Sequence, residues 1–442
     1  MKQFNVLNKL LLWNGLFMLL AIAACNKKDD YVVAKPELVE SPANKGQDTI
    51  TLGDSLLLHP KLMQVNIASY SWQVNGETKS ADSIFTFKPT ERGNYEISFK
   101  ASNEGGEVNL NYKIHVWGRY ENGFFIVNEG WYGHGTGTLS FYRYNTAILE
   151  DSVFIKENPD KDLKPASSTL QFGTIYRDNL YLVAKANGPV VVADAYSLKE
   201  TKRIAAQPGY DWRAFVGIDE QHGLLSSTKG IYRVNLETME LGEQVDNVSG
   251  QVADLMRVEN HIFAISQGEG LLIINANTYS VEKKITGMQL GFAQTPDGSV
   301  WAAGGTTLLK INPSTLNVEE ITLPFQVYGS WGAWHPSALT ASTVDNSVFI
   351  PKNSSWTSGN AIYKYDGTAA SLQQAFITLP SGKEMYGAGF AYDPQVNQLV
   401  VSTVNSGYNQ NNLYFYNANT GQEVNSFAYE GYYFPSVAVF HE

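Results

Sequence analysis

The stretch from Ser168 to Ala205 reads STLQFGTIYRDNLYLVAKANGPVVVADAYSLKETKRIA, and it decides the fold. It predicts four short strands, over residues 168–176, 180–186, 189–193 and 199–205. The turns between them are rich in Asn, Asp and Gly, which supply the positive φ that tight hairpins need. The unit is therefore expected to form a four-stranded antiparallel sheet.

This unit recurs to the end of the chain. Each copy contains an alternating strand that ends in Asn or Asp, followed by a short polar turn. The seven markers are Asn145, Asp194, Asn235, Asn275, Asn312, Asp366 and Asn417. A spacing of roughly 40–50 residues between short-strand units is typical of the blades of a β-propeller. We therefore predict an all-β protein in which residues 119–442 form a seven-bladed β-propeller.

The two ends of this region complement each other. Phe124–Val127 is a second strand without an inner strand before it, and Pro435–Phe440 is an inner strand with nothing after it. A ring of blades has no exposed edge if the last strand joins the first blade. We therefore expect Pro435–Phe440 to pair beside Phe124–Val127.

A smaller unit comes before the propeller. Residues 47–118 hold short alternating strands separated by turn signals, such as Asn75-Gly76 and Gly105-Gly106. The stretches SYSWQVNG (69–76) and GNYEISFKASNEGG (93–106) resemble a PKD or Ig-like module. We predict a small β-sandwich here, with Trp72 in its core and a spacer role.

The N-terminus has the pattern of an export signal. Lys2 and Lys9 precede an apolar run that ends at Cys25, so residues 1–24 are expected to be a signal peptide. Ile22-Ala-Ala-Cys25 resembles the lipobox of bacterial lipoproteins, in which the cysteine is lipidated. The following Asn-Lys-Lys-Asp-Asp resembles the signal that exports Bacteroidota lipoproteins to the cell surface; the alternative is a solvated tether. We expect residues 25–46 to be a tether, and a lipid anchor at Cys25 to hold the protein on the outer membrane.

Composition and motifs exclude several function classes. The chain has 32 Lys and Arg against 43 Asp and Glu, a formal net charge of −11, which argues against nucleic acid or an anionic membrane surface as a partner. Cys25 is the only cysteine, so no disulfide can form. No two histidines have metal-ligand spacing, and no nucleophile elbow, P-loop or dinucleotide fingerprint occurs. We predict no catalytic residue, metal or cofactor.

Candidate binding residues gather in the loops of one propeller face, where aromatic residues alternate with Asn, Gly and Ser. They are Trp131, Tyr132, His134, Tyr210, Trp212, Arg213, Trp331, Trp334, His335, Trp356, Tyr386, Tyr408 and Tyr432. We expect Trp131, Trp212, Trp331 and Trp334 to be the main anchors. The alternative is that these rings fill the channel or pack between blades. Arg213 can pair with a ligand anion or tie loops together, and the two histidines can be structural or general acid–base groups.

The opening of the propeller carries a family resemblance. GFFIVNEG (123–130) and GTLSFY (137–142) resemble the opening motif of YncE-like surface lipoproteins of Bacteroidota, which include the BtuG-type cobalamin-capturing propellers. The resemblance implies capture of a corrinoid for a TonB-dependent transporter, although the PKD-like module departs from the simplest members. The alternatives are a glycan-binding propeller, a lyase or hydrolase using His134 or His335, and a protein-binding scaffold.

Overall fold

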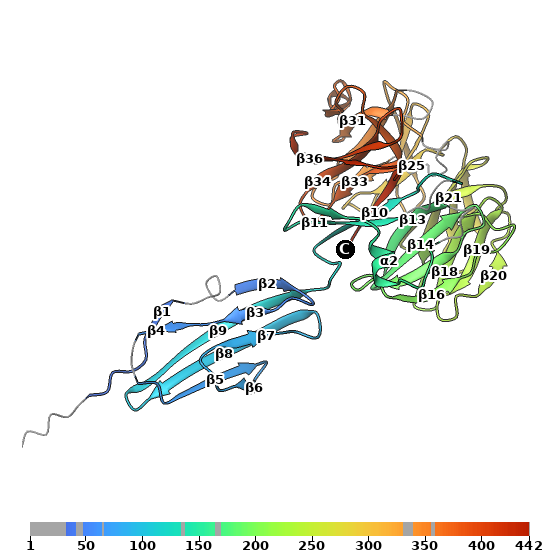
Figure 1. Cartoon of the computed structure of the whole chain (residues 1–442). Coiled ribbons are helices and arrows are strands. Elements are labelled where there is room, and N and C mark those ends of the chain that lie inside the picture. Colours follow the sequence, from blue (N-terminus) through green and yellow to red (C-terminus); the bar gives the residue numbers. More distant parts are fainter. Residues whose placement is uncertain are drawn as a thin grey trace, which may run out of the picture. The chain divides into compact units, whose positions relative to one another are not determined.

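The computed structural model describes residues 32–40, 47–63, 66–133, 138–163, 169–329, 339–354 and 359–441. The chain divides into two compact units, Met1–Trp117 and Gly118–Glu442. Both are built almost entirely from strands (Figure 1). In this part of the chain, no helix combines the length and the apolar character needed to cross a bilayer.

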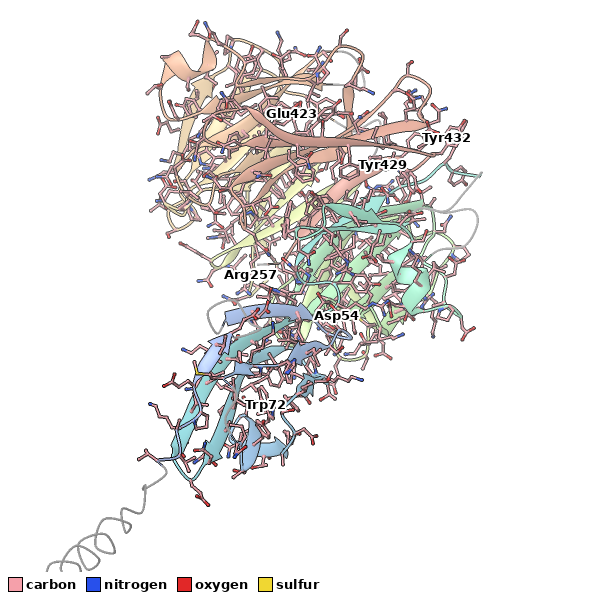
Figure 2. All side chains as sticks on the ribbon, turned by 60° about the vertical axis from the view of Figure 1, so that its left-hand side comes forward. Asp54, Trp72, Arg257, Glu423, Tyr429 and Tyr432 are labelled. Atoms are coloured by element: carbon pink, nitrogen blue, oxygen red, sulfur yellow. The ribbon has the colours of Figure 1, made fainter. Side chains whose placement is uncertain are left out.

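The first unit is a β-sandwich. One sheet has five strands in the order β2-β9-β8-β5-β6, and a smaller sheet pairs β3 with β7. The strands are β2 (Gln47–Thr51), β3 (Leu56–Leu58), β5 (Ser69–Val74), β6 (Glu77–Ser80), β7 (Phe85–Phe87), β8 (Gly93–Asn103) and β9 (Gly106–Trp117). Trp72, labelled in Figure 2, is fully buried against Phe99 and Tyr112. Its Nε1 donates a hydrogen bond of 2.9 Å to the carbonyl oxygen of Asp82. The predicted core role of Trp72 is confirmed.

The sandwich begins earlier in the chain than we expected. The expected tether, residues 25–46, contains strand β1 (Leu38–Glu40), which pairs with β4 (Lys61–Leu62). Lys61 and Glu40 form an ion pair of 2.6 Å. The side chain of Asn103 also donates a hydrogen bond of 2.8 Å to the carbonyl oxygen of Ala34. These contacts place residues 34–40 in the folded module. The sequence analysis missed this because the partners lie on strands further along the chain, and the local sequence gives no sign of them.

The second unit is a ring of four-stranded sheets, as predicted. In the described residues there are five separate four-stranded sheets and one eight-stranded sheet made of two blades, which gives seven blades, each with its strands in chain order except at the closure. The first blade comprises β37 (Pro435–Phe440), β10 (Gly123–Asn128), β11 (Leu139–Arg143) and β12 (Ile148–Glu150). The second comprises β13 (Thr169–Tyr176), β14 (Asn179–Lys185), β15 (Val190–Asp194) and β16 (Glu200–Ile204). The next two comprise β17 (Trp212–Gly217), β18 (His222–Ser227), β19 (Gly230–Asn235), β20 (Leu241–Gln244), and β21 (Val252–Val258), β22 (His261–Ser266), β23 (Gly270–Asn275), β24 (Val281–Ile285).

The remaining blades follow the same plan. They comprise β25 (Gly291–Gln294), β26 (Val300–Gly304), β27 (Thr307–Ile311), β28 (Val318–Thr322), then β29 (Thr340–Ala341), β30 (Val348–Asn353), β31 (Gly359–Tyr365), β32 (Ile377–Thr378), and β33 (Glu384–Asp393), β34 (Gln398–Val404), β35 (Gln410–Asn417), β36 (Glu423–Glu430). Two short helices of the described part of this unit, α2 (Val153–Glu157) and η3 (Ala369–Leu372), lie in connections. In the stretch that opens our sequence analysis, predicted and observed strand ends differ by one residue at most.

The last strand closes the ring. β37 pairs antiparallel with β10, with Phe124 opposite Phe440 and Val127 opposite Val437. β37 also forms a parallel bridge to β33, so the first and last blades merge into one eight-stranded sheet. The predicted closure is confirmed, and it leaves neither the first nor the last inner strand as an open edge.

The marker residues build the turns between the third and fourth strands. Oδ1 of Asn235 accepts hydrogen bonds of 2.9 Å from the backbone N–H groups of Glu237 and Thr238. Met239, four residues after the marker, has a φ of 58°. The same geometry recurs after Asn275 and Asn312. An Asn or Asp is required because its short side chain can satisfy these backbone donors locally.

Candidate ligand-binding face

One face of the propeller carries the loops between second and third strands and the loops that enter each inner strand. We call it the aromatic face. Trp131 and Tyr132 follow β10, Tyr408 lies between β34 and β35, and Tyr432 precedes β37. Figure 2 shows Tyr432 at the rim of the propeller, beyond Tyr429. Five candidates fall outside the described residues: His134, Trp331, Trp334, His335 and Trp356.

The structure brings several predicted aromatic residues together around Phe434, which our sequence analysis missed. The ring centroid of Trp131 lies 4.6 Å from that of Tyr432. The rings of Tyr386 and Tyr408 lie 5.2 Å and 5.4 Å from that of Phe434. We call these five residues the Phe434 cluster. Its residues Trp131, Tyr408 and Tyr432, with neighbouring Tyr132, are 41–58% exposed, so several large aromatic residues on these loops are open to solvent.

Backbone hydrogen bonds hold the cluster at the closure. The N–H groups of Glu129 and Gly130 donate to the carbonyl oxygens of Phe434 and Tyr433, at 2.9 Å and 2.8 Å. Tyr408 and Phe434 have φ angles of 56° and 51°. Bulky residues rarely adopt this region, and such strain persists only where surrounding contacts enforce it. The stacked Tyr408–Phe434 pair is therefore a constrained feature of this face.

Trp212 does not reach the aromatic face. Its side chain is fully buried, and its ring packs 4.9 Å from Tyr210 and 5.8 Å from Tyr232. Our expectation that Trp212 anchors a ligand does not fit this position, because a ring with no exposed surface cannot contact one. Tyr210 is half-buried and stays at the surface beside it.

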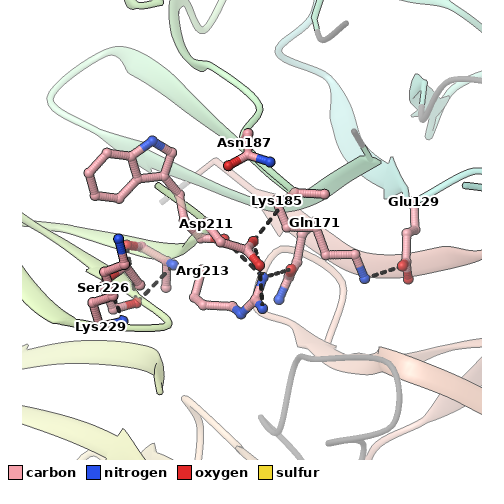
Figure 3. A network of polar contacts seen from close by, with 12 residues as sticks. Glu129, Gln171, Lys185, Asn187, Asp211, Arg213, Ser226 and Lys229 are labelled. Carbon is pink, nitrogen blue, oxygen red and sulfur yellow. Dashed lines mark hydrogen bonds and ion pairs between the residues drawn. The ribbon is translucent and has the colours of Figure 1, made fainter. Parts of the chain in front are cut away.

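A buried polar network lies next to the Phe434 cluster (Figure 3). Glu129 forms an ion pair with Lys185, and its other oxygen, Oε2, accepts a hydrogen bond of 2.6 Å from the Tyr386 hydroxyl. Glu129 thus connects the first, second and last blades. Tyr386 belongs to both groups, because its ring contacts Phe434 and its hydroxyl contacts Glu129.

Arg213 belongs to the second half of this network. Its guanidinium contacts both carboxylate oxygens of Asp211, at 2.6 Å and 3.1 Å, and Oε1 of Gln171 at 3.4 Å. Oδ1 of Asp211 also accepts a hydrogen bond of 2.7 Å from the backbone N–H of Ala186. Arg213 is 2% exposed. Of the two roles we considered for Arg213, these contacts fit the one that ties loops together.

In four inner strands, an irregularity in the pairing lies at a polar or phenolic residue near the start of the strand. The pairing of β13, β17, β21 and β33 with their second strands shifts register around Gln171, Arg213, Asp254 and Tyr386 respectively. Each of these residues lies within the first three positions of its strand. Bulges re-aim side chains and are common beside functional sites. The sequence signal for them is a polar or phenolic residue within the first three positions of a mainly apolar inner strand.

Burial perturbs the ionisable groups of the network. It lowers the pKa of Lys185, against the opposing effect of the Glu129 carboxylate. It raises the pKa of the Tyr386 hydroxyl, and the charge of Glu129 adds to that effect. Perturbed ionisable groups cluster at functional sites more often than elsewhere. In the described ranges, no three His, Cys, Asp or Glu side chains gather as a metal site would require.

Comparison by sequence identifies both parts of the chain. Residues 122–441 match the model of a family described as a domain of unknown function, DUF5074. Residues 42–103 match the model of a PKD-like domain, which confirms the predicted PKD-like module. None of the curated proteins compared with the chain matches it.

Comparison by structure supports the same architecture. The chain is similar to a quinoprotein alcohol dehydrogenase-like protein from Bacteroides thetaiotaomicron, with 19% identity and a TM-score of 0.62, over 92% of this chain and 99% of that one. It is also similar to a chain of the mitotic checkpoint complex, with 14% identity and a TM-score of 0.50, over 68% of this chain and 87% of that one. At these identities the likeness concerns the fold alone.

Proposed function

The chain belongs to the DUF5074 family, and we propose that its propeller captures a corrinoid on the aromatic face. The observation that carries this proposal is the Phe434 cluster, in which partly exposed rings from the first and last blades meet beside a buried polar network. Small-molecule sites combine aromatic walls with a few placed polar groups in this way.

The chemistry of a corrinoid fits this arrangement. Its macrocycle is large and partly apolar, and amide side chains surround it. The exposed rings of Trp131, Tyr408 and Tyr432 can cover an apolar face, while side-chain and backbone groups meet the amides. A glycan is the second candidate, since Trp and Tyr also stack on sugar rings.

Location and partners are part of the proposal. A lipid on Cys25 anchors the protein in the outer membrane, facing outward, and the propeller passes its ligand to a TonB-dependent transporter. The sequence features that support this are the lipobox-like segment before Cys25 and the charged segment after it. The PKD-like module serves as a spacer.

Titration calorimetry tests the proposal. Full-length protein in detergent is titrated with cyanocobalamin and with a panel of oligosaccharides. Saturable binding of cyanocobalamin supports corrinoid capture, whereas binding of oligosaccharides alone transfers the protein to the glycan class.

We also propose that the protein catalyses no reaction on its ligand. Replacing both His134 and His335 with alanine is expected to change affinity by less than about tenfold, or about 1.4 kcal/mol. A lyase or hydrolase activity that either replacement abolishes contradicts this part of the proposal.

A further inference from the structure

Buried charges gather beside the Phe434 cluster, at the channel end of the aromatic face. Glu129 and Lys185 are each 7% exposed, and Arg213 is 2% exposed. Removing charges from water is unfavourable, and apolar residues of similar volume are often at least as stable at such positions. Stability alone therefore gives no reason for this group.

Each cation of the group already has a carboxylate. Lys185 is paired with Glu129, and Arg213 makes a bidentate contact with Asp211. Figure 3 shows the Lys185 side chain extending toward Glu129, away from Arg213. A ligand carboxylate would have to compete with a carboxylate that the fold holds in place. The positive charge near the face is thus neutralised before any ligand arrives.

Glu129 connects its ion pair with Lys185 to the aromatic rings of the Phe434 cluster. Its backbone N–H donates to the carbonyl oxygen of Phe434, and its side chain accepts from the hydroxyl of Tyr386. A ligand on the Phe434 cluster therefore lies close to Glu129. A carboxylate has about four acceptor sites, and Glu129 makes side-chain contacts with Lys185 and Tyr386, so it can also accept a hydrogen bond from an amide N–H or a hydroxyl group of a ligand.

We propose that the Glu129–Lys185 pair is a specificity-determining subsite, which accepts neutral amide or hydroxyl groups of a ligand bound on the Phe434 cluster and rejects carboxylates. The inference rests on the proposed function and deepens it by naming the chemical class of the ligand. The physical reason is that like charges brought together at a desolvated interface are strongly unfavourable.

Two matched ligand pairs test the subsite. The first is dicyanocobinamide, whose corrin side chains are amides, against dicyanocobyrinic acid, whose side chains are carboxylates. The second is oligomannose against oligomannuronate. Calorimetry on the full chain gives the ratio of Kd for the acid to Kd for the neutral member. We expect this ratio to be about tenfold or more in the natural protein.

Three variants give an expected order of ratios. Glu129→Gln keeps an oxygen for Tyr386 but removes the negative charge beside Lys185, so acids should bind best here and the ratio should be lowest. Glu129→Gln with Lys185→Met removes both charges, and its ratio should be intermediate. This double variant buries no lone charge, so it keeps the test usable if the single variant fails to fold. Glu150→Gln, which breaks the Arg143–Glu150 pair between β11 and β12, is the control and should leave the ratio unchanged.

The outcomes separate this inference from the proposed function. The expected order with either ligand pair supports the subsite. A natural protein that prefers the acid, or one ratio shared by all variants, overturns the subsite and leaves ligand capture intact. Binding of the mannose pair alone overturns corrinoid capture, and the Kd ratios measured with that pair then test the subsite. A protein that binds none of the four compounds overturns both.

Discussion

The hydroxyl of Tyr144 donates a hydrogen bond of 2.7 Å to Oδ2 of Asp393, across the seam at which the propeller closes. Tyr144 follows β11 in the first blade, and Asp393 ends β33 in the last blade. Asp393 is fully buried. The closure thus depends on a buried polar contact as well as on the strand pairing of β37.

Tyr144→Phe is expected to lower the free energy of unfolding by about 1–3 kcal/mol, because it leaves a buried carboxyl oxygen without its donor. Tyr416→Phe is the matched control. The Tyr416 hydroxyl is buried and has no hydrogen-bond partner among the described residues, so its removal should leave stability unchanged or raise it. Urea denaturation of both variants measures the difference. Equal destabilisation by the two changes would mean that the hydrogen bond across the seam contributes nothing.

The same contact predicts a pH dependence. Burial raises the pKa of Asp393 above its ordinary value of 3.8, although the Tyr144 hydroxyl and backbone donors oppose this effect. At a pH between the pKa of Asp393 in the unfolded state and its higher pKa in the folded state, Asp393 is protonated in the folded state and ionised in the unfolded state. The contribution of Asp393 to stability is therefore greatest below pH 3.8 and falls as pH rises through the folded-state pKa.

Asp393→Asn cannot ionise, so this contribution should be absent from the variant. We expect the stability of the natural protein, relative to Asp393→Asn, to fall as pH rises. Tyr144→Phe removes an opposing donor and should extend that fall to higher pH. Thermal unfolding of the three proteins across a pH series measures the effect, and a stability difference that stays constant with pH contradicts it.

Local chemistry explains why most of the fold was predictable. An Asn such as Asn235 satisfies its turn with backbone groups two and three residues away, so the marker pattern can be read in sequence order. The closure was predictable for a similar reason, since Pro435–Phe440 is a strand that lacks a blade of its own. Residues 34–40 were misassigned to a tether because their partners lie on strands far along the chain.

The candidate site was only partly predictable, because it depends on contacts that are distant in sequence. The spacing of aromatic residues places Trp131 and Tyr432 on one face, and the structure brings their rings together. Neither Phe434 nor the link from Glu129 to Tyr386 follows from local pattern. Trp212 looks like its exposed neighbours in sequence, but the packing against Tyr232 in β19 buries it.

The lipid anchor that we propose at Cys25 gives a prediction about location. Cys25→Ala removes the only thiol that can be acylated. The variant should leave the membrane fraction or fail to reach its site, whereas protease added to intact cells should digest the natural protein. Immunoblots of fractionated cells measure both effects. Protection of the natural protein in intact cells would place it on the periplasmic side of the outer membrane.

The Phe434 cluster gives the prediction that decides the binding face. Trp131 is 41% exposed and its ring lies against that of Tyr432, so a ligand on this face should contact both. Aromatic anchors of this kind typically cost about 2 kcal/mol or more when truncated, which is roughly thirtyfold in Kd. Trp131→Ala should therefore weaken cyanocobalamin binding by at least that factor, as measured by calorimetry.

Tyr279→Ala is the control. Tyr279 lies in a marker turn on the opposite face, where it packs against Arg233, so its replacement should not affect binding. Undiminished affinity in both Trp131→Ala and Tyr432→Ala would mean that the ligand binds elsewhere on the propeller.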